Sequence, residues 1–340
     1  MSIAELRQKS RLRITDKFTA PPVILRVDDS VIGTLGNFSA STGKAKSKKT
    51  FNVCAIVAAA LTNGTILNYT ASLPEGKEKI LYTDTEQSEY HCLRILKRIL
   101  QLTKLSTDKQ PETLEFLSLR RFNPKMRLAI IEEAIYHSEG LGLVIIDGIR
   151  DLAYDINSPA ESTNLITKLM QWTEERKIHI HTVLHLNKGD DNTRGHLGTE
   201  LNNKAETVLQ ITKDDFDKDI SFVASMYMRD IDFEPFAFRI NSLGLPVQVN
   251  EYQHRQTTSQ KGFDYNEVSE AKHREALENL FSEAVYISYG SLIDKLQKSY
   301  AAVGYSFGIN KAKSLKRFLE FKRMILKDDK FYRFNPDFYF

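Results

Sequence analysis

The sequence predicts an α/β protein with a mainly parallel sheet, followed by a smaller second domain. Two observations predict the sheet: a lysine-rich loop at residues 43–50 lies between an apolar strand and an apolar helix, and a later apolar run ends at Asp147. Parallel strands are covered by helices on both faces, so they are apolar along almost their whole length. A polar stretch at residues 251–262 has the composition of a linker, and the basic segment after it predicts the second domain.

The loop at residues 43–50 fits the phosphate-binding pattern G-x-x-x-x-G-K-[ST] at every position but one, where Lys48 replaces the second glycine. In such a loop, backbone N–H groups form an anion-binding nest at a helix N-terminus. The lysine reaches the outer phosphates and the hydroxyl reaches Mg²⁺. A lysine at the glycine position is expected to need an unusual backbone angle. The predicted ATP-binding residues are Gly43, Lys44, Ala45, Lys46, Ser47, Lys48, Lys49 and Thr50.

The segments around this loop support that interpretation. Residues 30–38 are predicted to form the buried strand before the loop, and residues 51–61 are predicted to form the apolar helix after it. The alternative is a solvated basic loop, since lysines occupy four of the six positions 44–49. The carboxylates farther along the chain favour phosphate binding.

The apolar run at residues 139–147 predicts a buried parallel strand that delivers Asp147 to the carboxyl edge of the sheet. In P-loop nucleotide-binding proteins, an aspartate in this place shares Mg²⁺ with the loop hydroxyl. The predicted metal ligands are therefore Thr50 and Asp147.

A second apolar strand, at residues 79–87, lies between these motifs and ends in Asp84-Thr85-Glu86. At this point the chain resembles the RecA-like P-loop ATPases, which carry a catalytic glutamate at the end of the corresponding strand. The resemblance implies that Glu86 orients the attacking water toward the γ-phosphate, while Lys49 acts on the phosphates. The alternative is that Glu86 is an acid at a helix N-terminus, where the helix dipole favours it.

The same resemblance implies a polar sensor at the end of the strand at residues 178–189, followed by a loop that faces nucleic acid. The sensor is His185 or Asn187, and the sequence does not decide between them. Arg194, in the loop after this strand, is the implied DNA contact.

A hairpin predicted at residues 221–241 has charged residues at its turn. It resembles the late hairpin of RecA-like helicases, whose basic residues reach the γ-phosphate bound by the neighbouring subunit. This implies that Arg229 is an arginine finger. The alternative is a solvated charge.

The second domain is predicted to be a winged helix, with helices at residues 273–283, 291–300 and 310–326 and a hairpin at residues 325–334. Between residues 295 and 333 there are eleven Lys or Arg and three acids, so this segment carries 11 − 3 = +8. The third helix is expected to enter a DNA groove; the alternatives are protein contacts or a solvated basic face. Its predicted DNA contacts are Lys311, Lys313, Lys316 and Arg317, of which the last three are expected to share one side.

The composition fits a globular intracellular protein of two parts. The chain has 340 residues, 41% of them hydrophobic, a formal net charge of +3 and only two cysteines, Cys54 and Cys92. The cysteines lie in predicted helices and indicate buried apolar groups in a reducing compartment. A polar start and the lack of an apolar run long enough to span a membrane predict a cytoplasmic protein with no membrane partner. The expected parts are an arm at 1–20, a core at 21–250, a linker at 251–262 and a winged helix at 263–340.

The full pattern therefore predicts a RecA-like P-loop NTPase core with a C-terminal winged helix, and it resembles the RepA-type ATPases of plasmids and mobile elements. That resemblance implies ATP and Mg²⁺ as cofactors and single-stranded or duplex DNA as partner. It also implies a homo-oligomer, with a hexamer favoured, that works with other replication or mobilisation proteins as a helicase or loader. Two alternatives stay open: a recombinase-like filament ATPase, and a DNA-binding regulator or partitioning factor that uses ATP as an assembly switch.

Overall fold

The computed structural model describes residues 2–186, 195–214, 217–249, 263, 265–266 and 268–338. The chain divides into two compact units, residues 1–252 and residues 253–340. The predicted linker at residues 251–262 lies outside the described residues. In the described part of the chain, no helix combines the length and the hydropathy that a membrane crossing requires.

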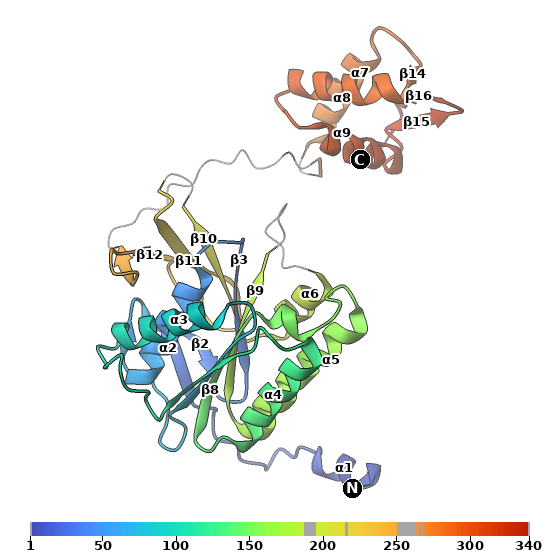
Figure 1. The fold of residues 1–340 in the computed structure, drawn as a ribbon. Helices are drawn as coiled ribbons and strands as arrows, with labels where there is room; N and C mark the ends of the chain where they lie inside the picture. The colour runs from blue at the N-terminus through green and yellow to red at the C-terminus, as the bar shows by residue number, and fades with distance from the viewer. Residues whose placement is uncertain are drawn as a thin grey trace. The chain divides into compact units, whose positions relative to one another are not determined.

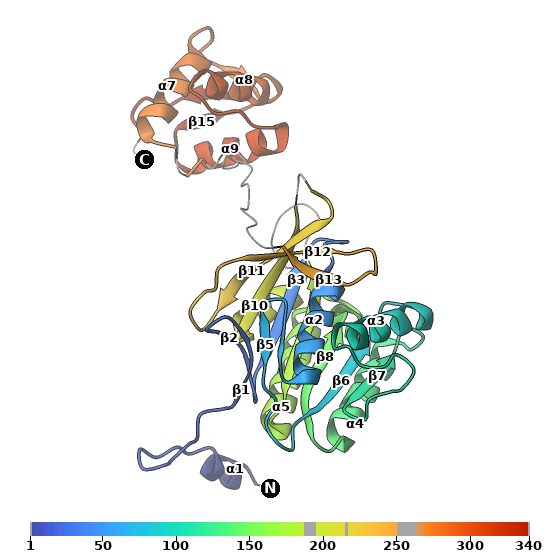
Figure 2. The ribbon, with the colours of Figure 1, turned by 90° about the vertical axis from the view of Figure 1, so that its left-hand side faces the viewer.

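The first unit is built on a sheet in which β3 (Phe38–Gly43) lies between β9 (His179–His185) and β10 (Thr207–Lys213). Over the described residues, the strand order is β13-β12-β11-β10-β3-β9-β8-β6-β7 (Figures 1 and 2). Neighbours from β10 to β7 run parallel, and those from β10 to β13 run antiparallel. The predicted α/β class with a mainly parallel sheet is thereby confirmed. The other strands are β6 (Lys79–Asp84), β7 (Leu114–Ser118), β8 (Leu141–Asp147), β11 (Ile220–Met228), β12 (Phe236–Ile240) and β13 (Pro246–Val249).

Helices cover both faces of this sheet. In Figure 1, α2 and α3 lie to the left of the sheet, and α4 and α5 lie to its right. The left-hand core includes Ile56 and Ile95, and the right-hand core includes Ile131 and Trp172. Burial on both faces explains why β8 has no exposed residue. The helices are α2 (Lys49–Thr62), α3 (Glu89–Leu102), α4 (Pro124–His137), α5 (Pro159–Arg176), α6 (Gly195–Lys204) and the 3₁₀ helix η1 (Ile149–Leu152).

α2 is apolar over most of its length because it packs against two sheets. A smaller sheet, of order β2-β1-β5-β4, packs against α2 beside the central sheet (Figure 2). Its Tyr69 donates a hydrogen bond of 2.9 Å to Asn52 on α2, which provides a partner for a polar group inside this core. The strands are β1 (Val23–Val27), β2 (Ser30–Thr34), β4 (Thr65–Ile66) and β5 (Tyr69–Ala71).

The continuous strand predicted at residues 30–38 is wrong. The chain turns after β2 at Gly36, whose φ of +88° is accessible to glycine, and β3 then begins at Phe38. β2 pairs antiparallel with β1 in the smaller sheet. The strand that leads into the loop is therefore β3.

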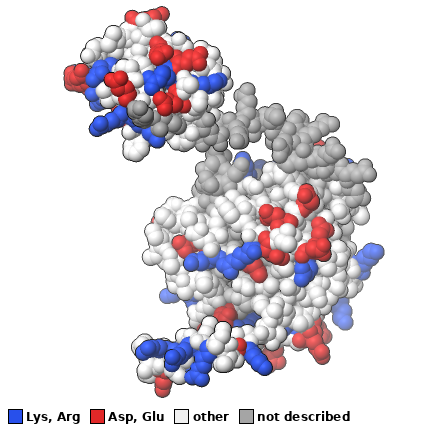
Figure 3. Space-filling view, turned by 180° about the vertical axis from the view of Figure 1, so that it is seen from behind, with Lys and Arg blue, Asp and Glu red and all other residues white. Residues whose placement is uncertain are grey.

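The N-terminal arm, residues 2–22, has no buried side chain. Its helix α1 (Ile3–Lys9) begins with a reciprocal capping box between Ser2 and Glu5. The helix is therefore stabilised by its own cap. The arm is basic, as the blue cluster at the lower left of Figure 3 shows. Its basic residues are Arg7, Lys9, Arg11, Arg13 and Lys17.

The second unit has three helices and, within its described residues, a small antiparallel sheet of order β14-β16-β15. Its core includes Leu277, Leu296, Leu315 and Leu319. The third helix was predicted to reach residue 326, which is wrong, because Arg323 has a φ of +54°. The elements are α7 (Glu270–Phe281), β14 (Ile287–Ser288), α8 (Tyr289–Ala302), α9 (Ile309–Phe321), β15 (Ile325–Asp328) and β16 (Phe331–Phe334).

The basic residues of α9 differ in their exposure. Lys313 and Arg317 are exposed. The Lys316 ammonium instead lies 2.6 Å from a Glu320 carboxylate oxygen and 4.8 Å from the centre of the Tyr332 ring. Lys316 is therefore engaged within its own domain, because α9 turns this position toward the small sheet.

A buried chain of hydrogen bonds joins β3 to β9. His179 Nδ1 lies 2.9 Å from the Thr34 carbonyl oxygen, and Ser39 Oγ lies 2.7 Å from both His179 Nε2 and His181 Nδ1. Ser41 Oγ lies 2.8 Å from His181 Nε2. A carbonyl can only accept, so His179 Nδ1 donates to it, and the direction of every following bond is then fixed with both rings neutral.

Burial lowers the pKa of both histidines, and lowers that of His181 to about 3. Below a pH of about 6.5, these histidines therefore bind protons in the unfolded chain, whereas in the folded chain they stay neutral. Stability is fully present above that pH and is lost as the pH falls.

We expect His181 alone to lower the free energy of unfolding by about 2 kcal/mol between pH 7 and pH 5. Urea unfolding across this range should show a shallower pH dependence for His181→Asn than for the natural protein, because asparagine takes up no proton. His137→Gln, at an exposed histidine, is the control for the loss of a histidine as such, and its slope should be steeper than that of His181→Asn. Equal slopes for the natural protein and His181→Asn would contradict the prediction.

Candidate functional site

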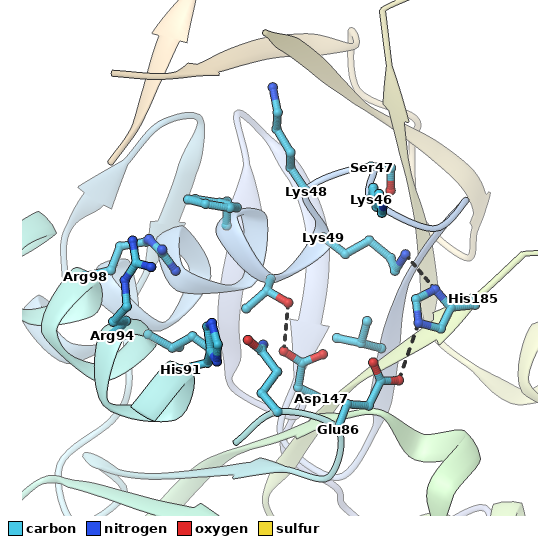
Figure 4. A pocket seen from close by; sticks show the side chains of 15 residues that line it. Lys46, Ser47, Lys48, Lys49, Glu86, His91, Arg94, Arg98, Asp147 and His185 are labelled. Carbon is cyan, nitrogen blue, oxygen red and sulfur yellow. Dashed lines mark hydrogen bonds and ion pairs between the residues drawn. The ribbon is translucent and has the colours of Figure 1, made fainter. Parts of the chain in front are cut away.

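A cavity of about 340 Å³ lies where the carboxyl ends of β3, β6, β8 and β9 meet. The P-loop, residues 43–50, forms part of its lining, and α3 contributes another part (Figure 4). Because parallel strands all end at this edge, residues far apart in the sequence converge here.

Gly43 is required by the space around it. A Cβ at this position would lie 2.3 Å from the Ile211 carbonyl oxygen and 2.5 Å from Ser47 Oγ. The Ser47 hydroxyl is buried and has no hydrogen-bond partner among the described residues. An orphaned hydroxyl in a loop that turns N–H groups inward is suited to an anionic ligand.

Lys48 adopts the left-handed conformation, with a φ of 70°, that the missing glycine would have taken. This confirms the unusual backbone angle expected from the sequence. The Lys48 ammonium donates to the carbonyl oxygens of Lys218 at 3.2 Å and Asp219 at 2.5 Å. These bonds tie the loop to the segment before β11 and offset part of the cost of the strained backbone.

Lys49 is 5% exposed and its ammonium has three acceptors. It donates to the carbonyl oxygens of Gly43 at 2.9 Å and Lys44 at 3.0 Å, and lies 3.0 Å from His185 Nδ1. Burial lowers the pKa of Lys49 to about 8, against the attraction of Asp147 and Glu86. The lysine is thus charged at neutral pH and is held by groups that phosphate oxygens can replace.

His185 connects Lys49 to Glu86. Since His185 Nδ1 accepts from the ammonium, a neutral ring donates through Nε2, which lies 3.4 Å from Glu86 Oε1. The contact with His185 lowers the pKa of Glu86, and the nearby Lys49 and Arg150 lower it further. The structure therefore brings together three of the predicted catalytic residues, with Glu86 ionised.

Thr50 and Asp147, the predicted metal ligands, are also in contact. Thr50 Oγ1 donates to Asp147 Oδ2 at 3.1 Å, and the hydroxyl of Tyr82 donates to the same oxygen at 2.8 Å. Burial, and after it the nearby Asp84, raises the pKa of Asp147 to about 7. A hydroxyl and a carboxylate are oxygen ligands of the kind that Mg²⁺ binds, so the residues present fit this cation.

Two buried residues support the site in ways that the sequence did not indicate. Tyr82 holds Asp147, as above, and Asp84 Oδ1 accepts from the backbone N–H groups of Glu86 at 2.9 Å and Gln87 at 2.7 Å. Asp84 therefore fixes the turn that presents Glu86. The sequence feature that could have revealed them is the alternation of side chains along β6, which places residues 82 and 84 on the same side of the strand.

Gly148 follows Asp147 for a steric reason. It has a φ of +106°, and a Cβ there would lie 2.1 Å from Thr85 Oγ1 and 3.0 Å from Glu86 Cγ. The ends of β6 and β8 thus approach so closely that a larger residue would displace Glu86.

Arg229, in contrast, lies far from this cavity. Its backbone N–H donates to the Glu206 carbonyl, and the Glu206 N–H donates to the Phe38 carbonyl, so Arg229 is level with the start of β3. The loop follows the other end of β3, about 16 Å away at 3.3 Å per residue. Arg229 cannot complete the site of its own chain.

Two further predicted residues, Asn187 and Arg194, lie outside the described residues. The predicted DNA contacts on α9 belong to the second unit. Of the candidates for the sensor, His185 is the one that the described structure brings into the cavity.

The strained loop yields a prediction that depends only on backbone geometry. Lys48→Gly should be more stable than Lys48→Ala by about 1 kcal/mol, because both variants lose the side-chain bonds but only alanine keeps the left-handed strain. The φ of Lys44 is not positive. At that position Lys44→Ala should therefore be more stable than Lys44→Gly. Urea unfolding measures both pairs, and the same order at both positions would contradict the prediction.

A comparison with protein-family models identifies the family of the chain. The family model described as AAA domain matches residues 9–191, which is more than half of the 340-residue chain. The crystal structure of the RadB recombinase is similar with a TM-score of 0.43 and 15% sequence identity, covering 62% of this chain and 89% of that chain. A comparison with curated proteins finds no match. The family match covers the loop, Glu86 and Asp147, and the chain therefore belongs to the AAA domain family of P-loop ATPases.

Proposed function

We propose that the protein hydrolyses ATP with Mg²⁺ and uses this energy to act on DNA, as a hexameric RepA-type helicase or loader in the replication or mobilisation of a mobile element. The observation that carries the proposal is the connected set Lys49, His185 and Glu86 beside the pair Thr50 and Asp147. A phosphate-binding lysine, an ionised carboxylate and a metal-ligand pair in one cavity are the groups that phosphoryl transfer to water requires.

Each side chain has a distinct role in this proposal. The Lys49 ammonium exchanges the carbonyls of its own loop for the β- and γ-phosphates of ATP, and Glu86 orients the attacking water. His185 lies between Lys49 and Glu86, so it senses whether the terminal phosphate is present. Thr50 and Asp147 hold Mg²⁺, which supplies positive charge at the phosphate oxygens.

The second unit is assigned to DNA. Three helices and a three-stranded antiparallel sheet, in the order described above, support a winged helix. On its third helix, Lys313 and Arg317 are exposed and one turn apart, so both can reach phosphates on one strand. Lys316, whose ammonium contacts Glu320, is not given this role.

The oligomer is assigned from the position of Arg229. Because this residue lies at the edge of the sheet opposite its own loop, it can act as an arginine finger only in the site of another copy. Its guanidinium donates to the Lys204 carbonyl at 3.0 Å and is otherwise exposed, so it is available at a surface where a second copy could bind.

The direct test is the rate of ATP hydrolysis with and without DNA. We expect hydrolysis that DNA stimulates, and a loss of the stimulation by duplex DNA when Lys313 and Arg317 are both replaced by alanine. Lys316→Ala is the matched control and should keep the stimulation. Hydrolysis that no DNA affects would contradict DNA-driven work and favour the regulator that uses ATP as an assembly switch. Stimulated hydrolysis by filaments, seen in place of rings by electron microscopy, would favour a recombinase-like protein.

Glu86→Gln keeps the shape of the side chain and removes its charge. We expect ATP binding to persist while turnover falls by roughly 10²-fold or more, as for the loss of a general base. Binding is measured by calorimetry and turnover by phosphate release. Near-normal turnover would show that another group orients the water, and Asp84 would be the first to examine.

Arg229→Ala should leave the nucleotide affinity of the chain nearly unchanged and lower hydrolysis by roughly 10³-fold or more, the range for an arginine finger. Mixing Arg229→Ala with Lys49→Ala subunits should then restore part of the activity, because an intact loop can meet an intact finger. Mixed oligomers with no recovery at any ratio would contradict action in trans.

A further inference from the structure

We propose that a second cavity, at the carboxyl ends of β6 and β7, binds a single strand of nucleic acid. In this proposal Arg120 and Arg121 hold its phosphates and the ring of Tyr90 stacks on a base. The cavity has a volume of about 480 Å³, and the one described lining residue that it shares with the nucleotide cavity is Gln87. The inference rests on the proposed function, because it names a surface through which the protein would act on DNA.

Two arginines on the wall of this cavity have no partner in the described part of the chain. Arg120 and Arg121 are exposed, and neither guanidinium makes a hydrogen bond or an ion pair with a described residue. The Arg121 guanidinium lies 4.9 Å from the centre of the Phe122 ring. Glu89 is the one acid among the described lining residues, so positive charge is in excess. Because a guanidinium matches a phosphate with two parallel N–H donors, this wall is suited to a phosphate-bearing ligand.

The turn that carries the two arginines is held in place by other groups. The guanidinium of Arg127, on α4, donates to the carbonyl oxygens of Leu119 at 3.1 Å and Arg120 at 2.8 Å. The Leu119 N–H donates to the Asp84 carbonyl at 2.7 Å. The two arginine side chains are therefore not needed to fix the turn. Since the Asp84 carboxylate also fixes the turn of Glu86, a ligand in this cavity would lie beside the catalytic end of β6.

The ring of Tyr90 provides an aromatic surface on the same cavity. Its side chain is 67% exposed, and its hydroxyl has no hydrogen-bond partner among the described residues. The ring lies edge-to-face against His91, with 5.4 Å between the ring centroids, and His91 Nδ1 lies 2.9 Å from Ser88 Oγ. Successive residues of a helix point about 100° apart, so Tyr90 faces a different side of α3 from His91, which lines the nucleotide cavity.

This combination favours a single strand over a duplex. In a duplex the bases are stacked on one another, whereas a single strand offers base faces as well as phosphates. Aromatic side chains beside a positively charged groove are the means by which proteins bind such strands without reading their sequence. The exposed ring of Tyr90 next to two unpaired guanidiniums has both parts.

The test measures the binding of the full chain to a fluorescent oligo-dT strand, and to a strand of the same length without bases, by fluorescence anisotropy. Replacing Arg120 and Arg121 together by alanine should weaken both strands by roughly tenfold or more, in the range of lost hydrogen bonds to charged groups. The slope of log Kd against log salt should fall by about 1.4, the value for two phosphate contacts on a single strand.

Tyr90→Ala should weaken oligo-dT by roughly fivefold or more, in the range of one base stack, and leave the strand without bases within about twofold. Tyr90→Phe keeps the ring and should recover the affinity for oligo-dT. The matched control replaces Lys97 and Lys125 together by alanine, which removes two positive charges from exposed positions outside the cavity. This control should leave the affinity for both strands nearly unchanged.

Unchanged affinity in the double arginine variant, or equal weakening in the lysine control, would overturn the proposal. Equal weakening of both strands by Tyr90→Ala would overturn the stacking role. Displacement of oligo-dT by dTMP at an equal concentration of nucleotides would make a free nucleotide the ligand in place of a strand. If the natural protein binds neither oligo-dT nor duplex DNA, the DNA part of the proposed function fails and this site with it. Strand binding that the variants do not alter leaves the proposed function standing and removes this site alone.

Discussion

The buried ammonium of Lys49 is the interaction on which the site depends. A charge this far from water is costly unless acceptors surround it, and here two carbonyl oxygens of its own loop and a ring nitrogen of His185 supply them. These three acceptors orient the side chain before any ligand binds. The same contact makes Nδ1 of His185 a hydrogen-bond acceptor, so in a neutral ring the other nitrogen, Nε2, carries the proton and faces Glu86. One lysine thus organises both the phosphate-binding end of the site and the group assigned to water.

The topology of the sheet makes this arrangement possible. β9 lies between the loop strand β3 and the strand β8 that carries Asp147. Its last residue, His185, is therefore placed between Lys49 on one side and the acids of β6 and β8 on the other. The buried histidine and serine chain holds β3 against β9 along the same boundary. Register and chemistry are linked here, because a slip of one residue would turn these side chains to the other face.

The sequence was sufficient for the parts of the fold that local patterns determine. The loop, the two acid-ended strands and the helix after the loop were predicted because apolar runs and charged ends are readable in order along the chain. The convergence of Thr50 with Asp147, and of Lys49 with His185, follows once the strands are parallel.

The remaining features depend on contacts between distant segments. The turn at Gly36 divides a stretch that reads as one strand, and only pairing with β1 shows that β2 belongs to another sheet. The roles of Tyr82 and Asp84 require knowledge of which side of β6 faces the loop. Lys316 follows helical spacing with Lys313 and Arg317, yet Tyr332 and Glu320 draw it inward. Helical spacing places Glu320 within reach of Lys316, but it cannot reveal Tyr332, which lies on β16.

The most direct measurement is a crystal structure of the protein with Mg²⁺ and a non-hydrolysable ATP analogue. The ammonium of Lys49 should leave the carbonyls of Gly43 and Lys44 and bind the outer phosphates, with the cation between Thr50 and Asp147 and the terminal phosphate facing His185 and Glu86. A nucleotide bound elsewhere, or a Lys49 that keeps its loop carbonyls while the nucleotide is bound, would contradict the central role given to this lysine.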